Sequence, residues 1–219
     1  MRIATWNLDH PTHQTQRFDA IRDHLLQVNA DLLILTEANA ALTLPGYTAV
    51  FSEESPYLRR GRNMDPPNRY HQVGIYAKGE LWKLEVTDSN GVAAEVDGFR
   101  VYGCVFTIKD RWAAWSDKTY TDRVHEQCAI IRELAGPDFL VAGDFNFRGA
   151  GNYNKTGAEQ VARLVDETGL TWPTRHEERT VQHLLHGPEL SLTYTVDSSV
   201  TLSDHPVVRA TGVRKDGKT

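Results

Sequence analysis

Apolar runs alternate along the first part of the chain with a segment whose apolar residues recur at helical spacing. Residues 3–7 predict a first strand, and Phe18, Ile21, Leu25 and Val28 follow at intervals of three and four, which predicts an amphipathic helix. The nearly continuous apolar run over 31–37 is typical of a strand buried on both faces. A strand, a helix and a second strand in this order indicate a βαβ unit and therefore the α/β class.

The same pattern continues to the C-terminal end. Further strands are predicted over 73–77, 81–87, 99–108, 140–144, 180–185 and around 206–208, and further helices from Thr121 to Leu134 and over 158–168. The turn pairs Asn90-Gly91 and Asp97-Gly98 predict that the central third is an antiparallel stretch of sheet. Residues 46–70 predict a long surface loop, and the tail after Gly212 is expected to be frayed.

Composition narrows the class of protein only moderately. The 219 residues suit a single domain over 1–219, and 40% hydrophobic with 24% charged residues is ordinary for a globular protein with a sizeable core. The net charge of −5 argues against broad, sequence-blind binding of nucleic acid. With two cysteines, no signal peptide and no apolar run that could span a membrane, we expect a cytoplasmic monomer with two buried thiols.

Candidate chemistry first appears at the end of the predicted strand over 140–144. Gly143-Asp144-Phe145-Asn146 follows the apolar run, and ligands of such sheets bind beyond the carboxyl ends of the strands. Asp144 and Asn146 alternate, so both can point to one side while Phe145 packs the other way. A carboxylate beside an amide suits polarisation of water or binding of a hard cation, although Gly-Asp and Phe-Asn also form ordinary turns.

Other predicted strands also end in polar residues, namely Asn7, Glu37 and the run Ser203-Asp204-His205. Each has a structural alternative. Glu37 could cap a helix or pair with an arginine, and Asp204 with His205 could form a turn. Asn7 could simply hold the first loop through a side-chain-to-backbone hydrogen bond. The remaining histidines without a ligand-like spacing are predicted to be surface or loop residues: His10, His13, His71, His125, His176, His183 and His186.

Taken together and in order, four short motifs resemble the endonuclease/exonuclease/phosphatase superfamily, which has the DNase I-like fold. The motifs are Thr5-Trp6-Asn7, Thr36-Glu37, Gly143-Asp144-Phe145-Asn146 and Ser203-Asp204-His205. They span nearly the whole chain, and four in order are far more specific than any one alone. The resemblance implies an α/β fold that is a four-layer sandwich, with two mixed β-sheets packed face to face and helices outside.

The resemblance also implies Mg²⁺- or Mn²⁺-dependent hydrolysis of phosphate esters. By position, Glu37 would be the principal metal ligand, assisted by Asn7 and Asp204. Asp144 would orient or deprotonate the attacking water, Asn146 would hold a phosphate oxygen, and His205 would bind or protonate the phosphoryl group. The chemistry is consistent, because hard oxygen ligands suit Mg²⁺ and histidine titrates near neutral pH.

Two positions depart from the family pattern. Gln182 stands where the family usually has an aspartate that orients the active-site histidine, and a glutamine stabilises an imidazolium far less than a carboxylate does. Many members also have a histidine or tyrosine at the end of the central strand, whereas this chain has Val105-Phe106-Thr107.

Substrate preference depends on two basic and aromatic segments. Arg59, Arg62 and Arg69 lie in the predicted loop, and Trp112 and Trp115 lie close to Arg111 and Lys118 in the sequence. Aromatic residues beside basic ones suit single strands or extruded bases. The alternative is that the tryptophans cover the edge of the core. We therefore expect a nuclease that acts on DNA or RNA. The alternatives are a phosphatase or phosphodiesterase for a small metabolite or lipid head group, and a catalytically weak member that binds nucleic acid or protein.

Overall fold

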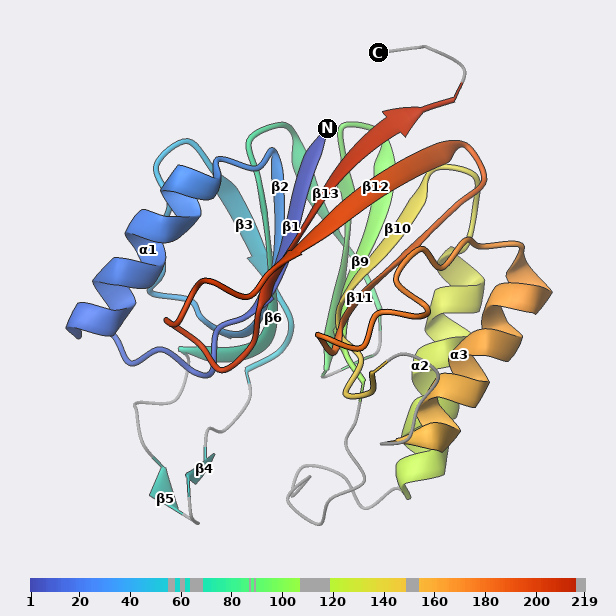
Figure 1. The fold of residues 1–219 in the computed structure, drawn as a ribbon, viewed down its shortest axis with the longest axis horizontal. Helices are drawn as coiled ribbons and strands as arrows, with labels where there is room; N and C mark the ends of the chain where they lie inside the picture. The colour runs from blue at the N-terminus through green and yellow to red at the C-terminus, as the bar shows by residue number, and fades with distance from the viewer. Residues whose placement is uncertain are drawn as a thin grey trace.

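Two β-sheets lie face to face with helices outside both of them (Figure 1). The computed structural model describes residues 1–54, 58–59, 62–63, 69–86, 88, 90–106, 119–148 and 154–215, with the backbone alone at 58–59 and 62–63.

The first sheet has six strands and contains the predicted βαβ unit. Across the sheet the strands are β12 (Leu190–Asp197), β13 (Val207–Arg214), β1 (Arg2–Asn7), β2 (Leu32–Asn39), β6 (Tyr70–Ala77) and β3 (Thr48–Phe51). Strands β1 and β2 are parallel and are connected by helix α1 (Gln16–Val28), while every other pair is antiparallel. The sheet is therefore mixed, and the carboxyl ends of β1 and β2 lie at the same edge.

The second sheet has five strands and is also mixed. Across it the strands are β11 (Gln182–His186), β10 (Phe139–Asp144), β9 (Phe99–Val105), β8 (Gly91–Val96) and β7 (Leu81–Leu84). Strands β9 and β10 are parallel, connected by helix α2 (Tyr120–Leu134), and helix α3 (Lys155–Thr168) follows β10. A separate two-residue ladder joins β4 (Leu58–Arg59) to β5 (Arg62–Asn63).

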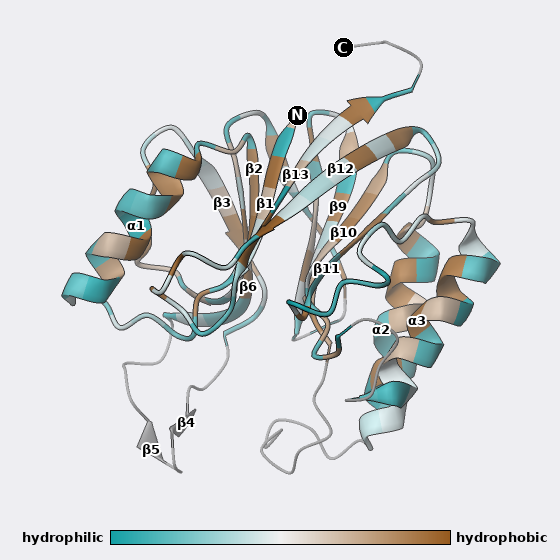
Figure 2. Ribbon diagram, viewed as in Figure 1, coloured by the Kyte–Doolittle hydropathy of each residue, from teal (hydrophilic) through white to brown (hydrophobic). Residues whose placement is uncertain are grey.

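Three apolar clusters fill the three interfaces between the four layers. One cluster lies between the sheets, one between α1 and the six-stranded sheet, and one between the five-stranded sheet and helices α2 and α3. Figure 2 shows the apolar residues concentrated in the strands and on the helix faces that meet them. The predicted four-layer α/β sandwich is confirmed, and both cysteines are free and buried as expected.

Several predicted boundaries were wrong. Residues 46–70 contain strand β3 as well as loop, β8 lies between the two predicted turn pairs, and β13 continues past Gly212 to pair with β12. Val213 and Arg214 belong to β13 because their backbone completes the ladder with β12, and residues 216–219 lie outside the described residues. Among the described residues, no helix is long and apolar enough to cross a membrane.

Helix α2 begins two residues earlier than the sequence predicted. Its N-cap is Thr119, not Thr121, because Thr119 and Asp122 form a reciprocal capping box: the Thr119 hydroxyl accepts from the Asp122 N–H, and the Asp122 carboxylate accepts from the Thr119 N–H. Thr121 lies exposed in the first helical turn.

Replacing Thr119 with alanine is therefore expected to lower the free energy of unfolding by about 1 kcal/mol, because the Asp122 N–H loses its partner. Urea denaturation followed by circular dichroism measures this loss. Thr121→Ala is the matched control and should change stability by no more than about 0.5 kcal/mol. Equal effects of the two substitutions would contradict the assignment of the cap.

Candidate active site

The predicted polar strand ends meet at the seam between the two sheets. Asn7 ends β1 in one sheet and Asp144 ends β10 in the other, and the Asn7 side-chain amide donates to Asp144 Oδ2 over 2.8 Å. Both side chains are buried. Asn7 also donates to Glu37 of β2, so one amide connects the two carboxylates across the seam.

Asp144 has the environment of a proton acceptor. Burial raises its pKa to about 6, although the positive charge of His205 and hydrogen bonds from Asn7 and the Asn146 backbone oppose the shift. Each carboxylate oxygen accepts one of these hydrogen bonds, from the Asn7 amide at Oδ2 and from the Asn146 N–H at Oδ1. The carboxylate is therefore fixed in orientation and titrates close to neutral pH.

A tight backbone turn places Asn146 beside Asp144. Gly143 has φ of 148°, and a Cβ there would lie 2.0 Å from the backbone oxygen of Cys104 on β9, so only glycine fits. Asn146 has φ of 52°, and its side-chain amide donates to the Phe106 carbonyl over 2.8 Å. As predicted, Phe145 points the other way and is fully buried.

The Glu37 side chain is 25% exposed and is paired with a histidine. His10 Nδ1 lies 2.6 Å from Glu37 Oε2, and the His10 side chain is 18% exposed. Burial alone would raise the pKa of Glu37, but attraction to His10, hydrogen bonds from His10 and Asn7, and attraction to His205 lower it overall. Glu37 is thus held as a carboxylate, and the alternative that it pairs with an arginine is not observed among the described residues.

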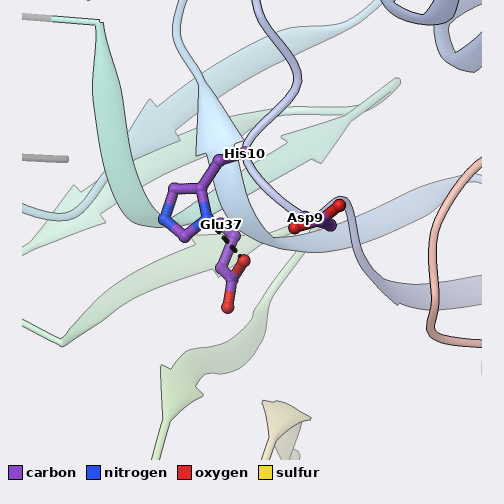
Figure 3. Close-up of side chains that lie close together, drawn as sticks. All are labelled: Asp9, His10 and Glu37. Carbon is purple, nitrogen blue, oxygen red and sulfur yellow. Dashed lines mark ion pairs between the residues drawn. The ribbon is translucent and has the colours of Figure 1, made fainter. Parts of the chain in front are cut away.

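Asp9 and His10 complete a cluster that the sequence analysis missed. One ligand atom each from Asp9, His10 and Glu37 lie within 4.8 Å of one another, and Figure 3 shows the His10 ring directed at the Glu37 carboxylate. The Asp9 N–H donates to Asn7 Oδ1 over 2.8 Å, so Asn7 does hold the first loop as well as joining the carboxylates. Two carboxylates and an imidazole are suitable donors for a divalent cation.

The loop with Asp204 and His205 is attached directly to β1. The Ser203 hydroxyl donates to the Asn7 carbonyl over 2.7 Å, and the Trp6 indole N–H donates to the His205 carbonyl over 2.9 Å. Asp204 Oδ1 lies 3.4 Å from His205 Nε2 and its side chain is 74% exposed, so Asp204 lies at the solvent side of the site.

Arg17 of α1 connects this loop to the one that carries Asp9. Its guanidinium donates to the carbonyls of Leu202, Leu8 and Asp9 over 2.7, 2.5 and 3.0 Å. One side chain thereby fixes the relative position of two loops that both contribute acidic groups to the site.

Gln182 does not take the role of the family's aspartate. It is fully buried on β11, and its side-chain oxygen accepts from the Thr5 hydroxyl over 3.1 Å, which forms a second contact between the sheets. Its Nε2 has no partner among the described residues. Among the described contacts, the Gln182 side chain is thus engaged with β1.

His183 and His186 were predicted to be surface or loop residues, and that prediction is wrong. Both are buried in β11. His183 donates from Nε2 to the Phe147 carbonyl over 3.0 Å, and its Nδ1 accepts from the Trp172 indole over 3.3 Å. Burial lowers its pKa to about 4, so His183 is neutral and supports the turn that carries Asn146.

Of the five predicted substrate-binding residues, Arg69 is the one whose side chain the structure describes. Arg69 donates to His13 Nδ1 over 2.8 Å, which places it next to the loop of His10. Arg59 and Arg62 pair through their backbones in the β4–β5 ladder, while Trp112 and Trp115 lie outside the described residues. A role in substrate binding stays a prediction for all five.

Comparisons with solved structures show the same fold at low sequence identity. The chain is similar to a 3′ phosphatase from Neisseria, named NExo and bound to a product DNA hairpin (17% identity, TM-score 0.68, 96% of this chain and 98% of that one). It is also similar to an AP endonuclease from Archaeoglobus fulgidus (14% identity, TM-score 0.67, covering 98% and 99%). The human Nocturnin catalytic domain is similar over 98% and 94% of the two chains, at 12% identity and a TM-score of 0.68.

A search of curated proteins found no match. Residues 4–205 match the model of the Endonuclease/Exonuclease/phosphatase family, a range that includes every member of the site from Asn7 to His205. The match and the geometry agree, and the chain belongs to the Endonuclease/Exonuclease/phosphatase family, whose members hydrolyse phosphate esters.

Proposed function

We propose that the protein is a metal-dependent phosphodiesterase that hydrolyses nucleic acid by direct attack of water. The observation that carries this proposal is the geometry at the seam: Asp144 is a buried carboxylate whose two oxygens are held by the Asn7 amide and the Asn146 N–H, and burial raises its pKa. A base that titrates near the working pH transfers protons most efficiently. The coarser conclusion, hydrolysis of a phosphate ester, follows from the family.

In the proposed reaction, Asp144 accepts the proton of the attacking water. Its two oxygens keep their orientation because the Asn7 amide and the Asn146 N–H each occupy one of them. His205 lies on the same site and binds or protonates the phosphoryl group, and Asn146 holds a phosphate oxygen. The reaction needs no covalent intermediate, because the site supplies a base and phosphate-binding groups.

A divalent metal, Mg²⁺ or Mn²⁺, would be held by Glu37 and Asp9, with Asn7 and Asp204 beside them. When bound, it would neutralise charge on the phosphoryl oxygens. The donor set fits such an ion, since the ligand atoms of Asp9 and Glu37 belong to one cluster and both side chains approach it from backbone with positive φ. Such backbone strain is characteristic of functional sites.

Nucleic acid is the substrate class that we favour. The structural neighbours include an AP endonuclease and a phosphatase solved with a DNA hairpin. The basic residues Arg59, Arg62 and Arg69, with Trp112 and Trp115, are the side chains that we propose contact it. Hydrolysis of a small phosphorylated metabolite is the second candidate, and the net charge of −5 favours it because an acidic surface repels a long polyanion.

Both candidates are tested by one panel of substrates. Single-stranded DNA, duplex DNA, duplex DNA with an abasic site, RNA, an aryl phosphodiester and an aryl phosphomonoester would each be incubated with Mg²⁺, Mn²⁺ or chelator. We expect metal-dependent cleavage of at least one nucleic acid. We also expect Glu37→Gln and His205→Ala each to lower kcat by about 10²-fold or more. The first removes a proposed metal ligand, and the second removes the group proposed to bind or protonate the phosphoryl group.

The outcomes separate the hypotheses. Turnover of the monoester alone would replace the nuclease proposal with a phosphatase. Absence of turnover in all arms, with both variants folded as well as the wild type, would favour a binding role for the same site.

A further inference from the structure

His10 distinguishes this site from one built only of oxygen donors. Its Nδ1 lies 2.6 Å from Glu37 Oε2, and Asp9 contributes the third donor of the same cluster. A set of oxygen ligands alone would suit Mg²⁺, whereas an imidazole nitrogen is a ligand that Mg²⁺ rarely uses.

The position of His10 is fixed by the fold. Asp9 and His10 have φ of 50° and 47°, so the chain makes a left-handed turn immediately after β1 that brings both side chains to Glu37. Non-glycine residues adopt this conformation at a cost, and Asp and His are among those that tolerate it best. The ring of His10 also contacts that of Tyr70, with centroids 5.8 Å apart.

We infer that His10 is a nitrogen ligand of the metal centre, with the Nδ1 proton that it donates to Glu37 released to solvent when the ion binds, and that the centre therefore selects Mn²⁺ over Mg²⁺. The inference rests on the proposed function, since it concerns the metal that the same carboxylates would hold. First-row transition ions accept imidazole nitrogen readily and bind mixed nitrogen and oxygen sites more tightly than Mg²⁺ does. Glu37 and Asp9 would supply the oxygen ligands of this mixed site.

A different role would make His10 a competitor of the metal. An imidazolium paired with Glu37 would occupy the place of the cation, and removing it would then strengthen the binding of every divalent ion. The two roles predict opposite effects of the same substitution.

The test uses His10→Asn, because asparagine accepts positive φ and replaces the nitrogen donor with an oxygen donor. His13→Asn is the matched control, since His13 lies in the same loop but is bound to Arg69. Calorimetric titration with Mn²⁺ and with Mg²⁺ gives the ratio of affinities, and pulsed electron paramagnetic resonance of bound Mn²⁺ detects a coordinated nitrogen. Glu37→Gln identifies the site to which any measured binding belongs.

We expect nitrogen coupling in the wild type and in His13→Asn, its loss in His10→Asn, and a fall of the Mn²⁺ to Mg²⁺ affinity ratio by about tenfold or more. Glu37-dependent Mn²⁺ binding without nitrogen coupling would overturn the inference but leave the proposed function intact. Tighter binding of both ions by His10→Asn would also overturn it. Absence of any Glu37-dependent metal binding would instead overturn the metal-dependent function itself.

Discussion

Replacing Asp144 with asparagine is expected to lower kcat by about 10²–10⁴-fold on the substrate that the protein hydrolyses fastest, because it removes the general base. Asparagine keeps the size of the side chain and can still accept one hydrogen bond, from Asn7 or from the Asn146 N–H. The loss is therefore expected in kcat far more than in substrate affinity.

The pH dependence gives an independent readout of the same residue. Burial raises the pKa of Asp144 to about 6, so the carboxylate is protonated and inactive below that pH. The kcat/KM of the wild type should rise with pH through about 6, and this acidic limb should be absent from Asp144→Asn. Stopped-flow or fluorescence assays from pH 5 to 8 would measure both profiles, in steps of about 0.5.

Asp88 provides the control, because it is a half-buried carboxyl whose pKa is also raised by burial. It lies outside the cluster and accepts hydrogen bonds from the Tyr102 hydroxyl and the Asn90 N–H. Asp88→Asn should leave the acidic limb in place. An Asp144→Asn protein that retained both full kcat and the limb would show that another group is the base.

Replacing His183 with leucine is expected to lower the free energy of unfolding by about 2–5 kcal/mol, since it leaves the Phe147 carbonyl and the Trp172 indole N–H buried without their partner. His183 is fully buried among aromatic rings, so water cannot replace the lost hydrogen bonds. We also expect a lower kcat, because the turn that carries Asn146 loses its support.

The same variant changes the dependence of stability on pH. The pKa of His183 is lowered from 6.5 to about 4, so between these values the unfolded chain binds more protons than the folded one. The His183 contribution to stability is therefore present above pH 6.5 and is lost as the pH falls through about 4. The raised pKa of Asp144 makes its own contribution to stability fall as the pH rises, over a pH range that overlaps that of His183. The His183 contribution is therefore read from the difference in stability between the variant and the wild type.

Denaturant unfolding at pH 5 and pH 7.5 would measure both effects of His183→Leu. His186→Leu is the control, because His186 is buried in the same strand but its Nδ1 bonds the Gly187 carbonyl at the other end of β11. The His186→Leu variant should have the same kcat as the wild type. Equal loss of kcat in the two variants would contradict a specific role of His183 in supporting the turn.

The candidate site could be predicted from the sequence where a polar residue directly follows a buried apolar run, although Glu37 lies within β2 and not at its end as predicted. Asn7, Glu37 and Asp144 follow apolar runs, and the order of their motifs matched a known family. Strand β12 was not predicted, although its apolar residues alternate strictly from Leu190 to Val196, which is typical of a strand.

Asp9 and His10 could not be found in this way. Both belong to a polar loop with no periodic pattern, and they reach Glu37 only because two successive residues adopt positive φ. The prediction for His183 was wrong for a different reason: its polar neighbour Gln182 favours an exposed position, whereas every residue of β11 is buried.

The contacts that assemble the site join the two ends of the chain, and this has a consequence for the order of folding. Asn7 and Asp144 are 137 residues apart, Asn7 and Ser203 are 196 apart, and Trp6 and His205 are 199 apart. Loops of this length close slowly, and β1 gains its neighbour β13 only when both ends have been brought together. During refolding, secondary structure should therefore return before hydrolysis does, and the interval between the two would be the time that the two ends of the chain take to meet.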